Sequence, residues 1–157
     1  MTTYVAIEMS GMTESRTYLD ANVFIYAVEG DPEIADPLHK LFELFRGRRE
    51  TAVTSDLTLA EVLARATVMR RRSYLSLIVW SQIFELQPVS REVLIETAEY
   101  RRKAGMPKLP DAIHVVTAIR SGCRTILSAD SRLKLPEGFS VLVPNRQNLS
   151  RLIRELS

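Results

Sequence analysis

"TYLDANVFIYAVEG", residues 17–30, combines a short β-rich run with a longer apolar segment. The stretch predicts a buried strand that runs directly into a buried helix. Asp20 and Asn22 stand where the two elements join, with apolar residues on either side. Because burying an unpaired carboxylate is costly, Asp20 requires a partner, a metal ion or a shifted pKa. The rest of the chain must supply whatever offsets this charge.

Further β-rich runs follow, and stretches with helical spacing separate them. The predicted strands cover residues 17–20, 50–55, 84–89, 124–130 and 139–145. After the helix of the opening stretch, helices are predicted at 32–47, 56–71, 90–105 and 109–122. This alternation predicts an α/β fold with a mostly parallel sheet of about five strands, covered by helices on both faces.

The composition is that of one globular domain. The chain has 157 residues, of which 46% are hydrophobic and 25% charged, and no linker divides it. We expect a single domain over residues 17–157, preceded by a loose N-terminal arm, residues 1–16. A net charge of +2 is too small to indicate a nucleic-acid partner by itself.

The cysteine content and the lengths of the apolar runs indicate the cellular compartment that we expect for the protein. Cys123 is the single cysteine, so an internal disulfide is excluded and a reducing cytoplasm is expected, with the thiol buried as a packing residue. One cysteine and two histidines disfavour a structural zinc site. No apolar run approaches the roughly 20 residues that a membrane-spanning helix needs.

Four acidic residues occupy positions where a parallel sheet binds ligands, beyond the carboxyl ends of its strands. Asp20 ends the first strand, Asp111 opens a helix and Asp130 follows the strand at 124–130. Glu61 lies within the helix at 56–71, among apolar neighbours that suggest an inward-facing side chain. We therefore expect these carboxylates to converge on one edge of the sheet.

Each carboxylate also has an ordinary structural interpretation. Asp111 suits the positive end of a helix dipole, and Asp130 suits a turn in "SADS". Glu61 is a common helix former whose carboxylate can reach solvent. Asp20 is the hardest to explain in this way.

Converging carboxylates repel one another unless a cation lies among them. Oxygen ligands select hard cations such as Mg²⁺ or Mn²⁺, and phosphate oxygens of a substrate often complete their coordination. The sequence thus predicts a metal-dependent site for phosphate chemistry, in which the metal offsets Asp20.

Three of these segments together resemble the PIN-domain family, and within it the VapC-type toxins of type II toxin–antitoxin systems. "YLDANVFIYAVEG" is similar to the first motif of the family, "TSDLTLAEVLAR" to the second and "LPDAIHVVTAIRSGCRTILSAD" to the third. The resemblance covers nearly all of residues 17–145. It implies a three-layer α/β/α sandwich and metal-dependent endonucleolytic cleavage of RNA.

The resemblance also implies roles for individual residues. Asp20, Glu61, Asp111 and Asp130 would be the catalytic residues and would bind Mg²⁺ or Mn²⁺. Asn22 and Ser128 would support them by orienting the carboxylates. His114, which lies one turn after Asp111, is interpreted as part of the core or the wall of the site rather than as a ligand. Hydrolysis would follow in-line attack by water, and neither the number of ions nor the general base is assigned.

RNA and protein partners require further surfaces. Among three basic clusters, Arg70, Arg71 and Arg72 are our candidates for RNA binding, although solvated helix ends explain such clusters equally well. We expect Trp80 to lie in the core. Alternatively, an apolar patch of Tyr74, Leu77, Ile78 and Trp80 would face a second copy or an antitoxin. The resemblance implies a homodimer and a cognate antitoxin.

Other functions remain open at this point. An RNA-processing PIN nuclease without an antitoxin would use the same acids. A catalytically inactive binding module would keep the fold without turnover, and the presence of all four acids argues against it. A haloacid-dehalogenase-type phosphatase is disfavoured, because it requires a second aspartate where this chain has Asn22.

Overall fold

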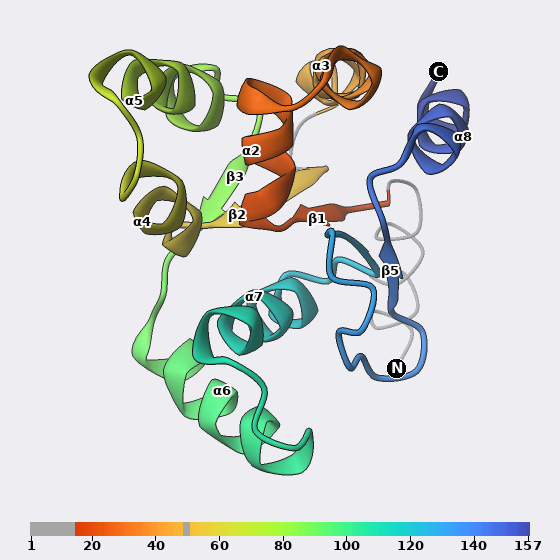
Figure 1. The fold of residues 1–157 in the computed structure, drawn as a ribbon. Coiled ribbons are helices and arrows are strands. Elements are labelled where there is room, and N and C mark those ends of the chain that lie inside the picture. Colours follow the sequence, from red (N-terminus) through yellow and green to blue (C-terminus); the bar gives the residue numbers. More distant parts are fainter. Residues whose placement is uncertain (1–14, 49–50) are drawn as a thin grey trace.

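The computed structural model describes residues 15–48 and 51–157. At its centre is a five-stranded, entirely parallel sheet (Figure 1). The strand order is β3-β2-β1-β4-β5. The strands are β1 (Thr17–Leu19), β2 (Ala52–Ser55), β3 (Glu85–Gln87), β4 (Thr125–Leu127) and β5 (Ser140–Leu142). All the predicted strands are therefore confirmed. The predicted N-terminal arm, apart from its last two residues, lies outside the described residues.

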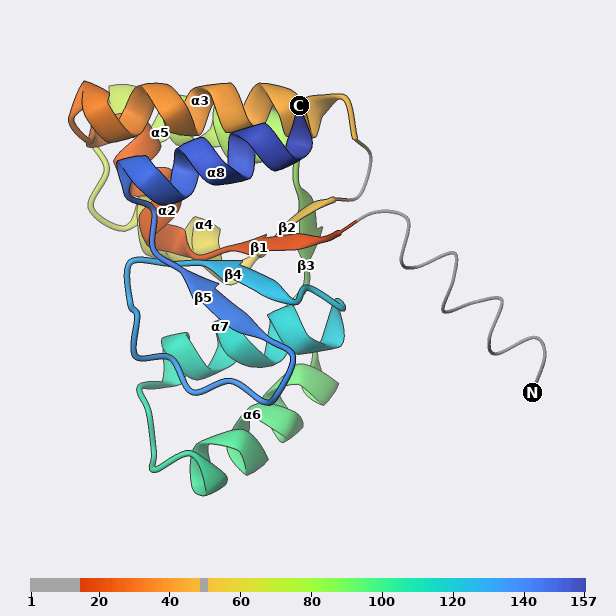
Figure 2. The same cartoon turned by 90° about the vertical axis from the view of Figure 1, so that its right-hand side faces the viewer.

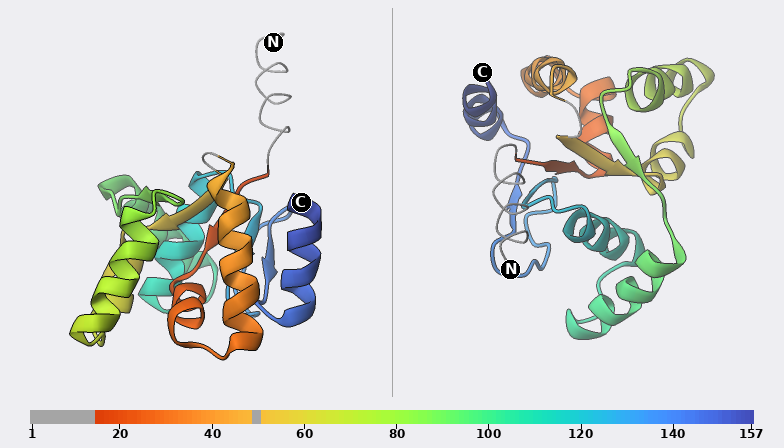
Figure 3. Two further views of the ribbon diagram at one scale, coloured as in Figure 1. Left: turned by 90° about the horizontal axis from the view of Figure 1, so that it is seen from above. Right: turned by 180° about the vertical axis from the view of Figure 1, so that it is seen from behind.

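Helices cover both faces of this sheet (Figure 2). On one face lie α2 (Ala21–Glu29), α3 (Pro32–Arg46), α5 (Val68–Leu75) and α8 (Arg146–Leu156). The opposite face carries α6 (Arg91–Lys103) and α7 (Leu109–Arg120), as the rear view in Figure 3 also shows. The short helix α4 (Leu57–Leu63) follows β2 and packs against α2. The three-layer α/β/α architecture expected from the sequence is confirmed. None of the described helices has both the length and the apolar character that crossing a membrane requires.

Alternation along β1 directs its side chains to different layers. Leu19 packs into the main core with residues of α2, α3 and α8. Tyr18 points to the other face, where it packs with Val53, Ala118 and Ile126. The central strand is thus buried on both sides, and its C-terminal end leads straight into α2.

The helix predicted at 56–71 is two helices. It ends at Leu63, and Thr67 begins α5 by accepting a hydrogen bond from the Arg70 N–H at 3.2 Å. The intervening residues include alanines, which favour helix, so the amino-acid composition gave no sign that the helix is interrupted between Leu63 and Thr67. Thr67 was the available signal, because threonine is a favoured N-cap residue.

The expectation that Trp80 lies in the core is wrong, because it is 60% exposed. It ends η1 (Ser76–Trp80), a turn of π-helix that continues from α5. Tyr74 and Ile78 from the same predicted patch are buried, so those residues do not form a continuous apolar surface. Cys123 is buried, as expected.

Candidate functional site

The site lies where the chain reverses the direction in which it adds strands. From β1 the sheet grows through β2 to β3, and then through β4 to β5 on the other side. Such a switch point opens a crevice at the carboxyl ends of the strands. Asp20 directly follows β1 and Ser128 directly follows β4, so both side chains stand at this crevice.

Asp20 is the hub of hydrogen bonds that join these strand ends. Its Oδ1 accepts from the N–H of Ala21 at 2.7 Å, so the carboxylate caps helix α2. Its Oδ2 accepts from the Ser128 hydroxyl at 2.7 Å and from Asn22 Nδ2 at 3.3 Å. Asn22 Oδ1 in turn accepts from the N–H of Ala129 at 3.1 Å. The start of α2 and the loop after β4 are thereby fastened to one carboxylate.

These contacts change the explanation for the burial of Asp20. The carboxylate is only 6% exposed. Its own surroundings supply donors to both oxygens, which satisfies a buried carboxylate without a cation. The argument that a metal must offset Asp20 is therefore unnecessary, although the side chain remains at the edge of an open pocket.

All four predicted carboxylates line one pocket of about 640 Å³. Asp20 comes from the end of β1, Asp111 from the first turn of α7, Glu61 from α4 and Asp130 from the loop after β4. Sequence reasoning missed two charged residues of the same lining, Glu29 and Arg65. Arg65 lies just beyond the end of α4 at Leu63. Within the helix predicted at 56–71, its spacing of four residues from Glu61 was the available signal.

The gathered negative charge alters the acidity of Asp111. Partial burial raises the pKa of its carboxyl group above the ordinary value, and the charges of Asp20 and Asp130 raise this pKa further. His114 lowers the pKa of Asp111, whereas the charge of Glu61 raises it. Like charges therefore destabilise one another in this pocket, as the sequence suggested.

His114 lies behind these carboxylates and is almost completely buried. Its Nε2 is 2.6 Å from Glu61 Oε1 and 3.5 Å from Asp20 Oδ1, and its Nδ1 is 2.6 Å from the Tyr18 hydroxyl. Burial raises the pKa of Tyr18 well above its ordinary value, and the charge of Asp20 adds to this rise in pKa. The expected position in the wall of the site is correct, but the direct contact with Glu61 went unnoticed.

The carboxylates fit a hard divalent cation by the chemistry of their donor atoms, which are all oxygens. The repulsion felt by Asp111 is also of the kind that a cation relieves. Within residues 15–48 and 51–157, however, no three His, Cys, Asp or Glu side chains are arranged to hold an ion as they stand. Binding would require these acids to draw closer together.

Basic residues other than the predicted cluster line the pockets that hold the acids. Arg70 pairs with Glu29 at 2.5 Å, and Arg71 and Arg72 are absent from the lining of the acidic pocket. Among residues 15–48 and 51–157, Arg65 is the one basic residue in that lining. A neighbouring pocket of about 230 Å³ shares Asp111 and Asp130 with the acidic pocket and is also lined by Arg132 and Lys134.

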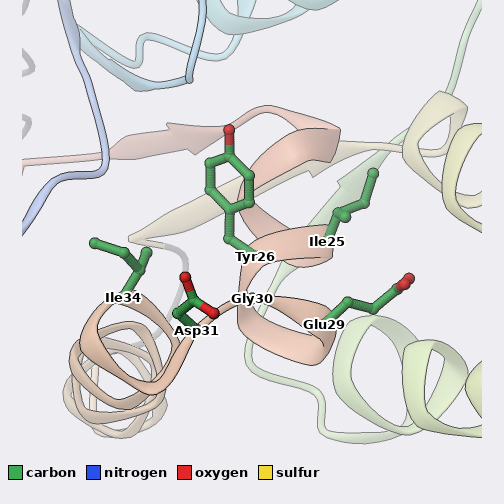
Figure 4. A pocket seen from close by; sticks show the side chains of 6 residues that line it. All are labelled: Ile25, Tyr26, Glu29, Gly30, Asp31 and Ile34. Atoms are coloured by element: carbon green, nitrogen blue, oxygen red, sulfur yellow. The ribbon is translucent and has the colours of Figure 1, made fainter.

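A third hollow, of about 430 Å³, adjoins the acidic pocket through Ile25 and Glu29 (Figure 4). Figure 4 shows these two side chains on α2, with Ile34 beyond the turn at Gly30 and Asp31. Ile25 and Tyr26 are partly exposed here, so an apolar surface borders the acids.

Comparisons with known proteins agree with this architecture. One similar structure is a chain of VapBC2 from Rickettsia felis, which was solved bound to a DNA fragment from the VapBC2 promoter. The two folds superpose with a TM-score of 0.63 and 18% sequence identity, and the match covers 81% of this chain and 97% of that chain. A chain of FitAB bound to an IR36 DNA fragment has a TM-score of 0.58 and 17% sequence identity, and the match covers 82% of this chain and 94% of that chain. At these identities the likeness shows the fold.

No curated protein matches the chain in sequence. The family match is independent of the solved structures: residues 17–137 match the PIN domain, a span that includes all four carboxylates of the pocket. The chain therefore belongs to the PIN-domain family.

Proposed function

We propose that the protein is a metal-dependent endoribonuclease that hydrolyses phosphodiester bonds of single-stranded or structured RNA, and that it is the toxin of a toxin–antitoxin pair. The observation that carries this proposal is the meeting of Asp20, Glu61, Asp111 and Asp130 around one open pocket. These residues come from distant parts of the sequence, which an ordinary structural role for each would not require.

The four carboxylates would hold Mg²⁺ or Mn²⁺. A divalent cation there would provide a nucleophilic water at neutral pH and neutralise charge on the scissile phosphate. Ser128 and Asn22 orient Asp20 through their hydrogen bonds. Within the part of the chain that the structure describes, the Asp111 side chain makes no hydrogen bond or ion pair, so its carboxylate can turn toward a ligand.

Flanking phosphates of the RNA would be held by basic residues beside the acids. Arg65 lies at one side of the acidic pocket, and Arg132 and Lys134 line the pocket that shares Asp111 and Asp130. An RNA strand crossing the acids would therefore meet positive charge on both sides. The proposed contribution of Arg70, Arg71 and Arg72 would be confined to more distant phosphates.

An antitoxin is the proposed protein partner. Both similar solved complexes carry two-component names, VapBC2 and FitAB, and both were solved with DNA. The apolar border of the acidic pocket, with Ile25 and Tyr26 partly exposed, would seat such a partner and cover the acids. We also propose a homodimer and a cytoplasmic location. An RNA-processing nuclease without an antitoxin, and an inactive binding module, are the alternatives.

The decisive experiment measures cleavage of a cellular RNA pool by the purified protein with Mg²⁺, with Mn²⁺ and with chelator. Asp111→Asn removes a charge and preserves shape, so it should reduce cleavage to the level of the chelated wild-type protein. The matched control is Asp56→Asn, because Asp56 is exposed after β2 and lies outside the pocket.

Discrete fragments that require both metal and Asp111 would support the nuclease. Equal cleavage by the wild-type and Asp111→Asn proteins would contradict it, and metal binding without cleavage of any RNA would favour the binding module. An adjacent gene whose small protein product suppresses the cleavage on co-expression would distinguish a toxin from a processing nuclease.

A further inference from the structure

A buried chain of polar groups connects the start of α4 with the carboxylate that the same helix carries. The Ser55 hydroxyl accepts from the Leu57 N–H at 3.0 Å and lies beside Tyr18. The Tyr18 hydroxyl is 2.6 Å from His114 Nδ1, and His114 Nε2 is 2.6 Å from Glu61 Oε1. The chain thus passes through β2, β1 and α7 before it returns to α4.

The donor and acceptor capacities of the two groups set the direction of the hydrogen bond between His114 and Glu61. An ionised carboxylate only accepts hydrogen bonds, and Nε2 faces two of them, Glu61 at 2.6 Å and Asp20 at 3.5 Å. Nε2 must therefore carry a hydrogen and donate it to Glu61. The opposite tautomer would direct a lone pair of the ring at two negative charges.

The polar groups on the Nδ1 side of His114 are consistent with this direction. Leu57 N–H can only donate, so Ser55 Oγ accepts there and its own hydrogen is available to Tyr18. The hydrogen of the Tyr18 hydroxyl then points to His114 Nδ1, which fixes the plane of the ring.

Glu61 needs such a restraint more than the other acids of the pocket. Its side chain is 32% exposed, and α4 is only seven residues long. A glutamate side chain in this setting has several rotatable bonds, and ordering it costs conformational entropy. Tyr18, Ser55 and His114 are buried, so the groups that hold it are already ordered by packing.

We propose that His114 is a positioning residue that presents Glu61 to the pocket by donating a hydrogen bond from Nε2, while Tyr18 holds the imidazole ring. For its effect on metal binding and turnover, the proposal rests on the proposed function. The hydrogen bond itself does not depend on that function and can be measured alone.

The first test is long-range ¹⁵N–¹H NMR of the wild-type imidazoles. The sequence has two histidines, so His114→Gln assigns both spectra. His39 is an internal reference, since its Nε2 lies 2.8 Å from the carbonyl oxygen of Ala27 and must be protonated. We expect a protonated Nε2 in His114 and a change in its signal in Glu61→Gln. An unprotonated Nε2, or a signal that Glu61→Gln leaves in place, would overturn the proposal.

The second test compares Mn²⁺ affinity among variants whose fold is verified by circular dichroism. Glutamine at 114 retains one acceptor and one donor at a separation close to that of the imidazole nitrogens, whereas methionine retains neither. His114→Met should weaken Mn²⁺ binding about 10-fold to 100-fold, as loss of a group that orients a ligand does. His114→Gln should regain most of this affinity, and His39→Met should resemble wild type.

The outcomes separate the two proposals. Wild-type affinity in folded His114→Met, or equal loss in the Gln and Met variants, would overturn the positioning role. If the wild-type protein neither binds Mn²⁺ nor cleaves RNA, the proposed function fails, and the NMR measurement on wild type alone still decides whether His114 donates to Glu61.

Discussion

The Ser128 hydroxyl donates to Asp20 Oδ2 at 2.7 Å across 108 residues of sequence, and so joins the ends of two adjacent central strands. The same hydroxyl accepts from the Asp130 N–H at 3.1 Å. One buried oxygen atom therefore sets the orientation of Asp20 and the course of the loop that carries Asp130.

Ser128→Ala should impair both stability and the proposed activity. The substitution leaves a buried carboxylate oxygen short of a donor, which costs about 1–3 kcal/mol in the free energy of unfolding. Metal-dependent cleavage should fall about tenfold or more, because Asp20 is then less well oriented. Urea unfolding and initial rates measure the two effects. The control is Ser140→Ala on an exposed site of β5, and equal effects from both variants would contradict the prediction.

Asp111→Asn should stabilise the metal-free protein. The pKa of Asp111 is raised in the folded state, first by burial and then by Asp20 and Asp130, so its charged form opposes folding. This cost is absent at low pH and appears as pH rises through the unfolded value of about 3.9. Near neutral pH the variant should melt roughly 1–3 °C higher than wild type without metal, and the gain should vanish below about pH 4.

Added Mn²⁺ should reverse this order, because wild type gains more from binding than the variant does. Differential scanning calorimetry with and without Mn²⁺ measures both effects. A metal-free variant that melts below wild type at neutral pH would show that the Asp111 charge is not destabilising.

Arg65→Gln should weaken RNA binding more than Arg71→Gln. Arg65 lines the pocket that holds the acids, whereas Arg71 does not. Loss of one phosphate contact should reduce the slope of log affinity against log salt by about 0.7 for single-stranded RNA. Binding titrations at several salt concentrations, with an RNA that the Asp111→Asn protein binds without cutting, make the comparison. A larger effect at Arg71 would favour the originally predicted cluster on α5.

Cys123 should resist alkylation in the folded protein. Burial raises the pKa of its thiol to about 11, so the reactive thiolate is scarce at about pH 8 as well as inaccessible. Iodoacetamide should label the chain in concentrated urea and leave the native protein unlabelled, as mass spectrometry would show. Rapid labelling of the native protein would mean that β4 and its surroundings open readily.

The sequence predicted the order of strands and helices because each element carries its own local signal. Ser90 caps α6 by accepting from the Val93 N–H, as expected from its position before a helical run. Asp20, Glu61, Asp111 and Asp130 were found because parallel strands bring their carboxyl ends to one edge. Local pattern and topology together were sufficient for these residues.

Contacts that depend on the rotation of one element against another were not predictable in this way. The bond between His114 and Glu61 depends on how α7 packs relative to α4, which no local pattern encodes. Trp80 was misplaced because hydrophobicity alone does not bury a residue, and folded proteins expose much apolar surface. The break before Thr67 was concealed by residues that favour helix on both sides.

The strand order has a consequence for how the protein is made. Strand β4 pairs with the central strand β1, although it is synthesised after β2 and β3. A nascent chain that has not yet released residues 125–130 from the ribosome lacks Ser128 and Asp130 and has an open edge along β1. The pocket therefore cannot be completed before residues 125–130 have been produced, and until then the cell meets β1, β2 and β3 without a finished site.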